Sequence, residues 1–250
     1  MNTDLQTASM WKRISAWLFD TILLVSVVTL AAYLLFGAFR YDDYVSQLEQ
    51  IREKYQTQHQ IDFDQEQLPE NADAAEKEAY AARYADAKDA LEADVQWVRT
   101  LGIANSLIPL ISTLSVFVAM LLMEFVIPLL LKNGQTLGKK IFSLGVVRID
   151  AVRITPLQLF VRSILSKFTV CLMLPLYITA VGAVGIVVAL GIFVFQLVCP
   201  LVNREHRGLH DLLSGTVVVD LPSQRVFSSA TDRTEYLMKL HAERAARQDY

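Results

Sequence analysis

The sequence has few cysteines, only Cys171 and Cys199 among 250 residues. Both lie in the same long apolar stretch, where a free cysteine behaves as a small apolar packing residue. A disulfide framework uses several cysteines at characteristic spacings, and a zinc site uses them in closely spaced pairs. The cysteine pattern therefore predicts neither a disulfide framework nor a metal site.

Catalytic motifs are also missing. The sequence contains no nucleophile elbow, no arrangement typical of a catalytic triad and no glycine fingerprint for a dinucleotide. Gly134–Lys140 approaches a phosphate-binding loop, but its glycine spacing is one residue short and no Ser or Thr follows the lysines. We interpret this segment as a tight turn that leads into an interfacial helix. The sequence thus predicts no enzymatic activity and no cofactor.

One short polar segment, residues 205–211, carries two histidines and two acids. A zinc site needs ligands at well-defined spacing, and no second group of ligands accompanies this one. The segment is instead predicted to cap the last apolar stretch on the cytoplasmic side, with the carboxylate of Asp211 held by Arg204 or Arg207.

A cleavable signal peptide is not expected. Lys12 and Arg13 precede an apolar run, but this run is longer than the roughly 7–15 residues of a signal-peptide core. No small-residue cleavage motif follows it cleanly.

Long apolar stretches are what the sequence does contain. Hydrophobic residues make up 53% of the chain and the mean hydropathy is +0.34, whereas a soluble domain is about 45–50% apolar. The excess lies in residues 14–39, 101–131 and 168–202, and about 20 apolar residues suffice to cross a bilayer core about 30 Å thick. The third stretch is too long for one crossing and carries glycines near its middle. We predict that it forms a helical hairpin whose first helix begins near Leu157.

These stretches predict an all-α membrane protein with a four-span helical bundle; three spans is the alternative. Its first span lies in residues 8–39, and residues 40–100 form an insert. The remainder, 101–221, contains spans at about 104–131, 157–178 and 182–202, and residues 222–250 form a tail.

The charge distribution predicts the orientation, because Lys and Arg in short loops favour the cytoplasmic side. Residues 40–99 carry 15 acids and 7 bases, a net charge of −8, which places the insert outside. Four spans then place both termini in the cytoplasm. The segment 132–167 has only one acid, Asp150, and belongs inside because of its bases: Lys132, Lys139, Lys140, Arg148, Arg153, Arg162 and Lys167. Four of these, Lys139, Lys140, Arg148 and Arg153, suit anionic lipid headgroups, each worth about 1 kcal/mol near the surface.

The insert shows helical periodicity on both sides of a polar turn at Asp62–Asn71 that contains Pro69. This pattern favours an antiparallel helical hairpin, or extensions of the first and second spans. Such an insert is either a spacer or a docking surface for an extracytoplasmic protein. The apolar stripes are Tyr44, Leu48, Ile51 and Tyr55 in the first helix, and Tyr80, Tyr84, Ala87, Leu91, Val95 and Val98 in the second.

Short β-branched segments predict a small cytoplasmic β element. Leu144–Ile149 and Val152–Thr155 fit a hairpin, and Thr216–Asp220 has the same character, so that these strands would pair beneath the membrane. Thr231–Arg247 is predicted to be an amphipathic helix capped by Thr or Asp.

Charged residues inside the spans carry the functional hypothesis. Asp20 lies seven residues after Arg13, about 10.5 Å along a helix and on the same face. Glu124 lies at a comparable depth in the second span, and Arg162 and Lys167 lie in the inner half of the third. An ionised group left alone in the bilayer costs at least about 2.5–3.5 kcal/mol. We therefore predict a buried cluster in which Arg13 or Arg162 faces Asp20 and Glu124.

Such a cluster has two interpretations. It can hold the helices in register, as polar groups do in membrane bundles. It can also be a proton or cation site, in which a carboxylate in a low dielectric changes its protonation state when its ion exchanges.

Several motifs together resemble the RDD family. Trp11–Asp20 (Trp-Lys-Arg-Ile-Ser-Ala-Trp-Leu-Phe-Asp) is similar to the opening of that family, and Gly134–Val147 is similar to its cytoplasmic motif, which includes Gly134 and Gly138. The similarity ends with His210-Asp211-Leu-Leu-Ser-Gly-Thr-Val-Val-Val and covers roughly residues 8–39 and 101–221. The arginine and two aspartates that name the family correspond here to Arg13, Asp20 and Asp211.

The resemblance implies a multi-pass protein of the bacterial cytoplasmic membrane with a transport role, since cation/proton antiport is reported for some members. The expected function is transport of a small cation or solute, with Asp20 and Glu124 as exchange carboxylates and Arg13 and Arg162 as their counter-charges. The alternative is a non-transporting scaffold that recruits a partner through its insert or tail. A homo-oligomer is compatible with either function, and no nucleic-acid partner is expected.

Overall fold

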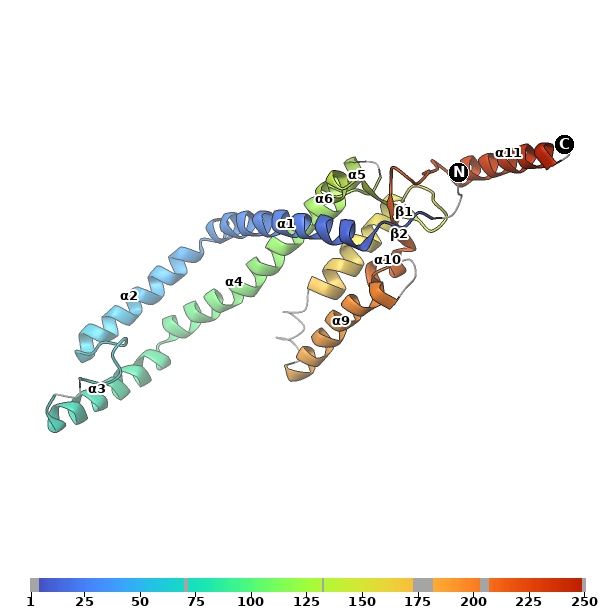
Figure 1. Cartoon of the computed structure of the whole chain (residues 1–250). Helices are drawn as coiled ribbons and strands as arrows, with labels where there is room; N and C mark the ends of the chain where they lie inside the picture. Colours follow the sequence, from blue (N-terminus) through green and yellow to red (C-terminus); the bar gives the residue numbers. More distant parts are fainter. Residues whose placement is uncertain (1–4, 70–71, 132, 173–181, 203–206, 249–250) are drawn as a thin grey trace. The chain divides into compact units, whose positions relative to one another are not determined.

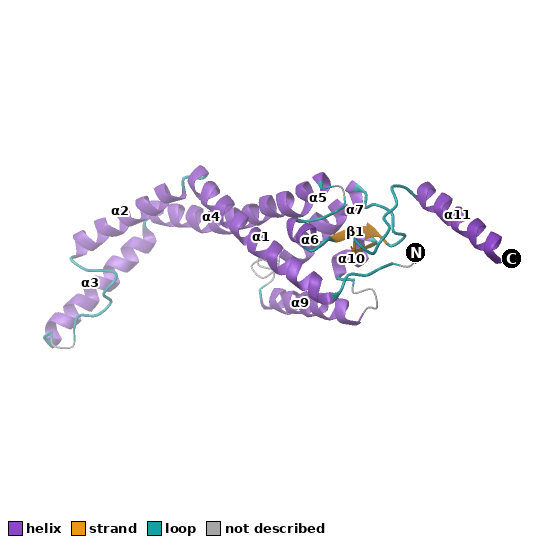
Figure 2. Ribbon diagram, turned by 45° about the horizontal axis from the view of Figure 1, so that its top comes forward, coloured by secondary structure: helices purple, strands orange, loops and turns teal. Residues whose placement is uncertain are grey.

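The structure is a computed structural model that describes residues 5–69, 72–131, 133–172, 182–202 and 207–248 (Figure 1). The chain folds as two compact units. One comprises residues 32–114, and the other comprises residues 1–31 together with 115–250. Helices predominate, and the strands form one small sheet (Figure 2).

Within the described part of the chain, two helices are long and apolar enough to cross a membrane. The first is α1, Met10–Ala38. The second runs without interruption from Val95 to Leu130, as α4 (Val95–Met120), the π-helix η1 (Leu121–Val126) and α5 (Ile127–Leu130).

Large apolar side chains on these helices face outward. Trp17 is 65% exposed, Ile22 is 59% exposed and Leu130 is 71% exposed. Many large exposed apolar side chains are unfavourable in water and are stable in contact with lipid or with another protein.

The third apolar stretch is helical where it is described. It begins with α7 (Pro156–Phe160), whose first turn is fixed by a capping box between Thr155 and Gln158. The helix continues as the π-helix η2 (Val161–Leu172), and the apolar α9 (Ala183–Val202) contacts it. The predicted turn of this hairpin, and the end of its first helix at about residue 178, fall in residues 173–181, outside the described residues.

A two-stranded antiparallel sheet joins distant parts of the sequence. It pairs β1 (Leu144–Arg148) with β2 (Thr216–Asp220), in a register that places Val146 opposite Val218. The valines of both strands are buried, together with Leu144 and Ala8. Two short helices flank the strands in sequence, α6 (Leu137–Ile141) before β1 and α10 (Leu209–Ser214) before β2.

The predicted hairpin between Leu144–Ile149 and Val152–Thr155 forms only in part. Arg153 makes one antiparallel bridge with Val147 of β1, whereas Val152 bridges Phe227. Thr7 adds a further bridge to the other edge of β2, opposite Val219.

The unit of residues 32–114 contains α2 (Tyr41–His59) and α3 (Ala74–Ala93), which contact each other. Arg40, with a φ of 53°, precedes α2. The core of this unit is formed by Ile61, Tyr80 and Ala87.

A tyrosine fixes the loop between these two helices. The hydroxyl of Tyr80 accepts a hydrogen bond from the backbone N–H of Asp62 (3.1 Å) and donates one to the carbonyl of Gln65 (2.8 Å). The predicted apolar stripe of the second helix ends at Leu91, since Val95 and Val98 are 80% and 55% exposed.

The C-terminal helix α11 spans Ala230–Gln248. Its predicted cap by Thr231 or Asp232 is wrong, because the helix begins earlier. The hydroxyl of Ser229 accepts a hydrogen bond from the N–H of Asp232 (3.1 Å), and the Asp232 carboxylate accepts one from the N–H of Ser228 (2.9 Å). Tyr236 and Phe227 hold the helix to the preceding segment, with Arg225 stacked 4.0 Å from the Tyr236 ring centroid.

Candidate functional site: buried ion pairs and the RDD residues

Asp20 binds the start of α6. Its side chain lies on α1 and is buried. It accepts hydrogen bonds from the hydroxyl of Thr136 and from the backbone N–H of Gly138 (2.7 Å). The ammonium of Lys139 lies 3.9 Å from the same carboxylate. A carboxylate that accepts hydrogen bonds from N–H groups in the first turn of a helix gives partners to donors that would otherwise be buried without them.

Gly138 permits this contact because its Cα lies against the backbone of α1. A β-carbon at this position would lie 2.9 Å from the carboxylate carbon of Asp20 and closer still to the carbonyl oxygen of Ala16. Any larger residue would push α6 away from α1 and lengthen the bond to Asp20.

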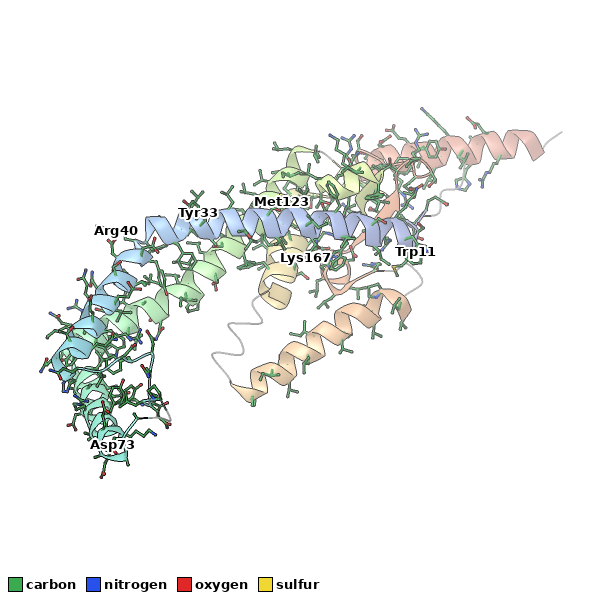
Figure 3. The ribbon with its side chains drawn as sticks, turned by 60° about the vertical axis from the view of Figure 1, so that its left-hand side comes forward. Trp11, Tyr33, Arg40, Asp73, Met123 and Lys167 are labelled. Atoms are coloured by element: carbon green, nitrogen blue, oxygen red, sulfur yellow. The ribbon has the colours of Figure 1, made fainter. Side chains whose placement is uncertain are left out.

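Glu124 and Lys167 form a second ion pair, with 2.7 Å between the carboxylate and the ammonium. Their side chains are 15% and 20% exposed. Glu124 belongs to η1, and Lys167, which is labelled in Figure 3, belongs to η2. The pair therefore joins two π-helical segments that contact each other. π-Helical turns are rare in proteins overall, and those that occur are often at functional sites.

Arg162 and Asp211 form the most deeply buried pair, with exposures of 4% and 3%. The guanidinium of Arg162 also donates to the hydroxyl of Thr216 (2.7 Å), and the backbone N–H of Gly208 donates to Asp211 (3.1 Å). This network connects η2, α10 and the first residue of β2.

The sequence model of the RDD family matches residues 7–215 of the chain. The chain belongs to the RDD family. The RDD match includes all three of the pairs described above, and RDD is a membrane family, in agreement with the two apolar helices. No curated protein and no solved structure matches the chain.

Arg13, Asp20 and Asp211, which the resemblance assigns to the family motif, each join a different pair of elements. Arg13, at the start of α1, donates to the carbonyl of Val218 in β2 (2.6 Å). Asp20 joins α1 to α6, and Asp211 joins α10 to η2. All three therefore connect helices to the small sheet or to the segments beside it.

The predicted partners of the buried charges are wrong. Arg162 pairs with Asp211 instead of Asp20 or Glu124, and Lys167 takes the position facing Glu124. These groups lie on short or π-helical segments, whose facing sides cannot be assigned from a regular helical period.

The predicted cap at Asp211 also requires correction. Arg207 donates to the backbone carbonyl of Asp211 (3.3 Å), whereas the Asp211 carboxylate binds Arg162. Arg204 lies outside the described residues.

Three residues of the site were missed as partners. Lys167 is expected in the inner half of the third span but not as the partner of Glu124, while Thr136 and Lys139 are expected in a turn and on a lipid-facing surface. A threonine just before a short helix is a typical N-cap, and the Thr136 side chain accepts the N–H of Lys139 at 3.4 Å. That signal could have located the start of α6.

The pKa values of Lys139 and Asp211, which lie outside the apolar helices, are shifted by their surroundings. Burial lowers the pKa of Lys139 to about 8, although the charge of Glu124 partly opposes this effect. Burial would raise the pKa of Asp211, but the Arg162 charge, the neighbouring His210 and the hydrogen bonds from Arg162 and Gly208 together outweigh burial and lower this pKa below its ordinary value. Asp211 is therefore ionised throughout the neutral range.

The remaining motif residues have local roles. Gly134 has a φ of +60°, a conformation that favours glycine, and it makes the turn before Thr136. The His210 ring lies against Gly208, and its Nδ1 atom is buried without a hydrogen-bond partner among the described residues. Within those residues, no three His, Cys, Asp or Glu side chains are grouped to hold a metal ion.

Because His210 is buried, the free energy of unfolding is expected to fall in acid. Burial lowers its pKa to about 3, so that between about pH 6.5 and pH 3 the unfolded chain binds a proton that the folded protein does not. Stability then falls as the pH falls, by about 2 kcal/mol at pH 5 relative to pH 7.5. Thermal unfolding midpoints at these two pH values should differ less for His210→Gln than for the wild type. An equal difference in both proteins would contradict this role of His210.

Proposed function

We propose that this RDD protein exchanges a small cation for protons across the bacterial cytoplasmic membrane, with Glu124 and Lys167 as its exchange pair. The observation that carries this proposal is the location of the pair. Both partners lie on π-helical segments, and Glu124 is part of an apolar helix long enough to span the bilayer.

The chemistry of the pair suits exchange. An ionised carboxylate in a low-dielectric environment needs a positive partner, which is the Lys167 ammonium in this structure. A proton or a small cation that enters can replace Lys167 as the neutralising charge. Because only one of them can occupy the carboxylate at a time, uptake of the cation would release the proton.

Asp20, the other carboxylate expected to exchange ions, has a different proposed role. Its carboxylate accepts two hydrogen bonds that fix Thr136 and Gly138, and these bonds would be lost if it exchanged ions freely. We assign Asp20 to the positioning of α6 and Lys139 beside the exchange pair.

The proposed topology has four spans: α1, the helix from Val95 to Leu130, the helix that begins at Pro156, and α9. Both termini and the small sheet would lie in the cytoplasm, with the acidic insert outside, as the distribution of Lys and Arg favours. Lys139 faces Asp20, so the proposed contact with anionic headgroups rests on Lys140, Arg148 and Arg153.

Everted membrane vesicles from a host without its own antiporters provide the test. Addition of Na⁺, Li⁺ or K⁺ should dequench a pH probe in vesicles that contain the wild-type protein. Glu124→Gln should reduce this exchange at least tenfold because its amide cannot bind and release a proton. Glu78→Gln, an exposed position in α3, provides the matched control and should leave exchange unchanged.

Two results would count against the proposal. No response to any of the three cations from well-expressed wild-type protein would exclude the exchange function for those ions. Full exchange by Glu124→Gln would exclude Glu124 as the exchange site.

The second candidate is a scaffold that transports nothing. It is favoured by the fact that Asp20, Glu124 and Asp211 all already have partners, as expected of side chains that only hold helices in register. In that case deletion of residues 45–95 should abolish the biological role, which is recruitment of an extracytoplasmic partner. Glu124→Gln would then alter stability alone.

A further inference from the structure

Lys139 is a largely buried cation that makes no hydrogen bond to a carboxylate among the described residues. Its side chain is 13% exposed. Its ammonium donates to the neutral hydroxyl of Thr136 at 3.1 Å and lies 3.9 Å from the Asp20 carboxylate, beyond hydrogen-bond distance. The Asp20 carboxylate instead accepts hydrogen bonds from the Thr136 hydroxyl and from the Gly138 N–H. The Lys139 ammonium is thus held by one neutral acceptor and by charges that it does not touch.

The two neighbouring cations are held more tightly. The Lys167 ammonium lies 2.7 Å from the Glu124 carboxylate, and the Arg162 guanidinium is hydrogen-bonded to Asp211. An arginine does not lose its proton in a protein. Of these three cations, Lys139 can therefore give up its proton with the smallest loss of contacts.

Charges on three elements act on Lys139. Asp20 of α1 and Glu124 of η1 favour its protonated form, whereas Lys167 and Arg162 of η2 oppose it. Burial has the largest effect and, together with these charges, lowers the pKa of Lys139 to about 8. An ordinary lysine, with a pKa of about 10.4, keeps its charge throughout the neutral range. Lys139 instead changes its charge close to neutral pH.

Entry of a cation at Glu124 changes this balance. In the ion-paired state the Glu124 carboxylate holds no proton, so a cation that binds there adds one positive charge to a largely buried cluster. The cation also cancels a negative charge that keeps Lys139 protonated. Loss of one proton from the Lys139 ammonium to water restores the original charge of the cluster. The neutral amine retains N–H groups, so its hydrogen bond to the Thr136 hydroxyl can persist.

We propose that Lys139 is a second proton-binding residue of the exchange site, which releases its proton when a cation binds at Glu124 and regains it when the cation leaves. The proton passes from the ammonium to water on the proposed cytoplasmic side, where the next residue, Lys140, is exposed. Lys139 has this role only if the exchange function proposed above holds. Because such coupling is reciprocal, protonation of Lys139 weakens cation binding by the same factor as the cation weakens proton binding.

The pH dependence of cation exchange tests this role in everted vesicles, whose outer face is the cytoplasmic face of the membrane. With a pKa of about 8 for Lys139, the half-saturating concentration of Na⁺, or of whichever of Na⁺, Li⁺ and K⁺ is exchanged, should fall about tenfold from pH 7 to pH 9 in the wild type. A change of less than threefold would overturn the proposal. This measurement does not depend on the folding of any variant.

Two substitutions separate the charge of Lys139 from its packing. Lys139→Arg carries a permanent charge and should keep the half-saturating concentration near the high wild-type value of pH 7 at both pH values. Lys139→Gln has no charge and should keep it near the low wild-type value of pH 9. The same two substitutions at the exposed Lys140 are the controls and should retain the wild-type profile. A merely structural defect would not place the two Lys139 variants at opposite plateaus.

Proton release is measured directly with purified protein in detergent, in a weak buffer that contains a pH indicator. At pH 8, addition of NaCl should release up to about half a proton per chain from the wild type, because Lys139 is then about half protonated. Choline chloride should release none. Lys140→Arg should behave as the wild type, and Lys139→Arg should release no proton.

The outcomes distinguish this role of Lys139 from the exchange function itself. If the wild type exchanges cations and both Lys139 variants keep its pH profile, Lys139 is not a proton-binding residue, although the exchange function stands. If Lys167→Arg abolishes proton release and Lys139→Arg does not, the released proton belongs to Lys167. No exchange of any of the three cations by well-expressed wild-type protein would overturn both proposals.

Discussion

Gly138→Ala is expected to lower the free energy of unfolding by about 2–5 kcal/mol, which combines overpacking with the loss of a charge-assisted hydrogen bond. The new methyl group would clash with the Ala16 carbonyl and with the Asp20 carboxylate. Since both are part of α1, α6 must shift, and the bond from the Gly138 N–H to Asp20 must lengthen. The thermal unfolding midpoint of purified protein in detergent measures this loss.

Gly102→Ala provides the matched control, because its β-carbon would meet nothing within 4 Å. An alanine in an open helical position is up to about 1 kcal/mol more favourable than glycine. The control should therefore unfold at the same temperature as the wild type or slightly higher. If Gly138→Ala behaved like Gly102→Ala, the close approach of α6 to α1 would be contradicted.

The sequence was sufficient to predict the helical membrane class and the family. Runs of apolar residues longer than about 20 indicate spans because length and hydropathy alone determine whether a helix can cross a bilayer. The RDD motifs around Asp20, Gly138 and Asp211 identified the family, which the match over residues 7–215 confirms.

The partners of the buried charges could not be predicted. Helical spacing indicates which residues share a face only while the helix keeps 3.6 residues per turn, and both η1 and η2 depart from that period. The hydrogen bonds between Asp20 and α6 depend on the position of this short helix, which is set by the turn at Gly134 and by the sheet. Such long-range contacts have no local signature in a single sequence.

Because long-range contacts have no local signature, the sequence also predicted Lys139 at the membrane surface. Its neighbour Lys140 is exposed, but the Lys139 ammonium lies beside Asp20 and donates to the Thr136 hydroxyl at 3.1 Å. Two adjacent lysines on a helix point about 100° apart, so that they can occupy very different environments. Only the docking of α6 against α1 determines which lysine faces inward.

Removal of the Asp211 charge should have the largest effect on stability. Asp211→Asn leaves the Arg162 guanidinium buried without a counter-charge, which costs about 3–5 kcal/mol. Asp43→Asn is the matched control, because Asp43 pairs with Arg40 at 2.6 Å on the surface, where both side chains are exposed. A surface pair of this kind contributes about 0–1 kcal/mol.

A double-mutant cycle separates the ion pair from the rest of its network. If the large cost of Asp211→Asn comes from the unpaired guanidinium, then Arg162→Met should recover at least about 2 kcal/mol when it is combined with that substitution. Recovery should be incomplete, because the Thr216 hydroxyl also loses the hydrogen bond that the Arg162 guanidinium donates to it. Additive effects of the two substitutions on the unfolding midpoint would show that the carboxylate and the guanidinium do not act as a pair. Asp211 would then act through the hydrogen bonds that it accepts from the Gly208 N–H and the Thr216 hydroxyl.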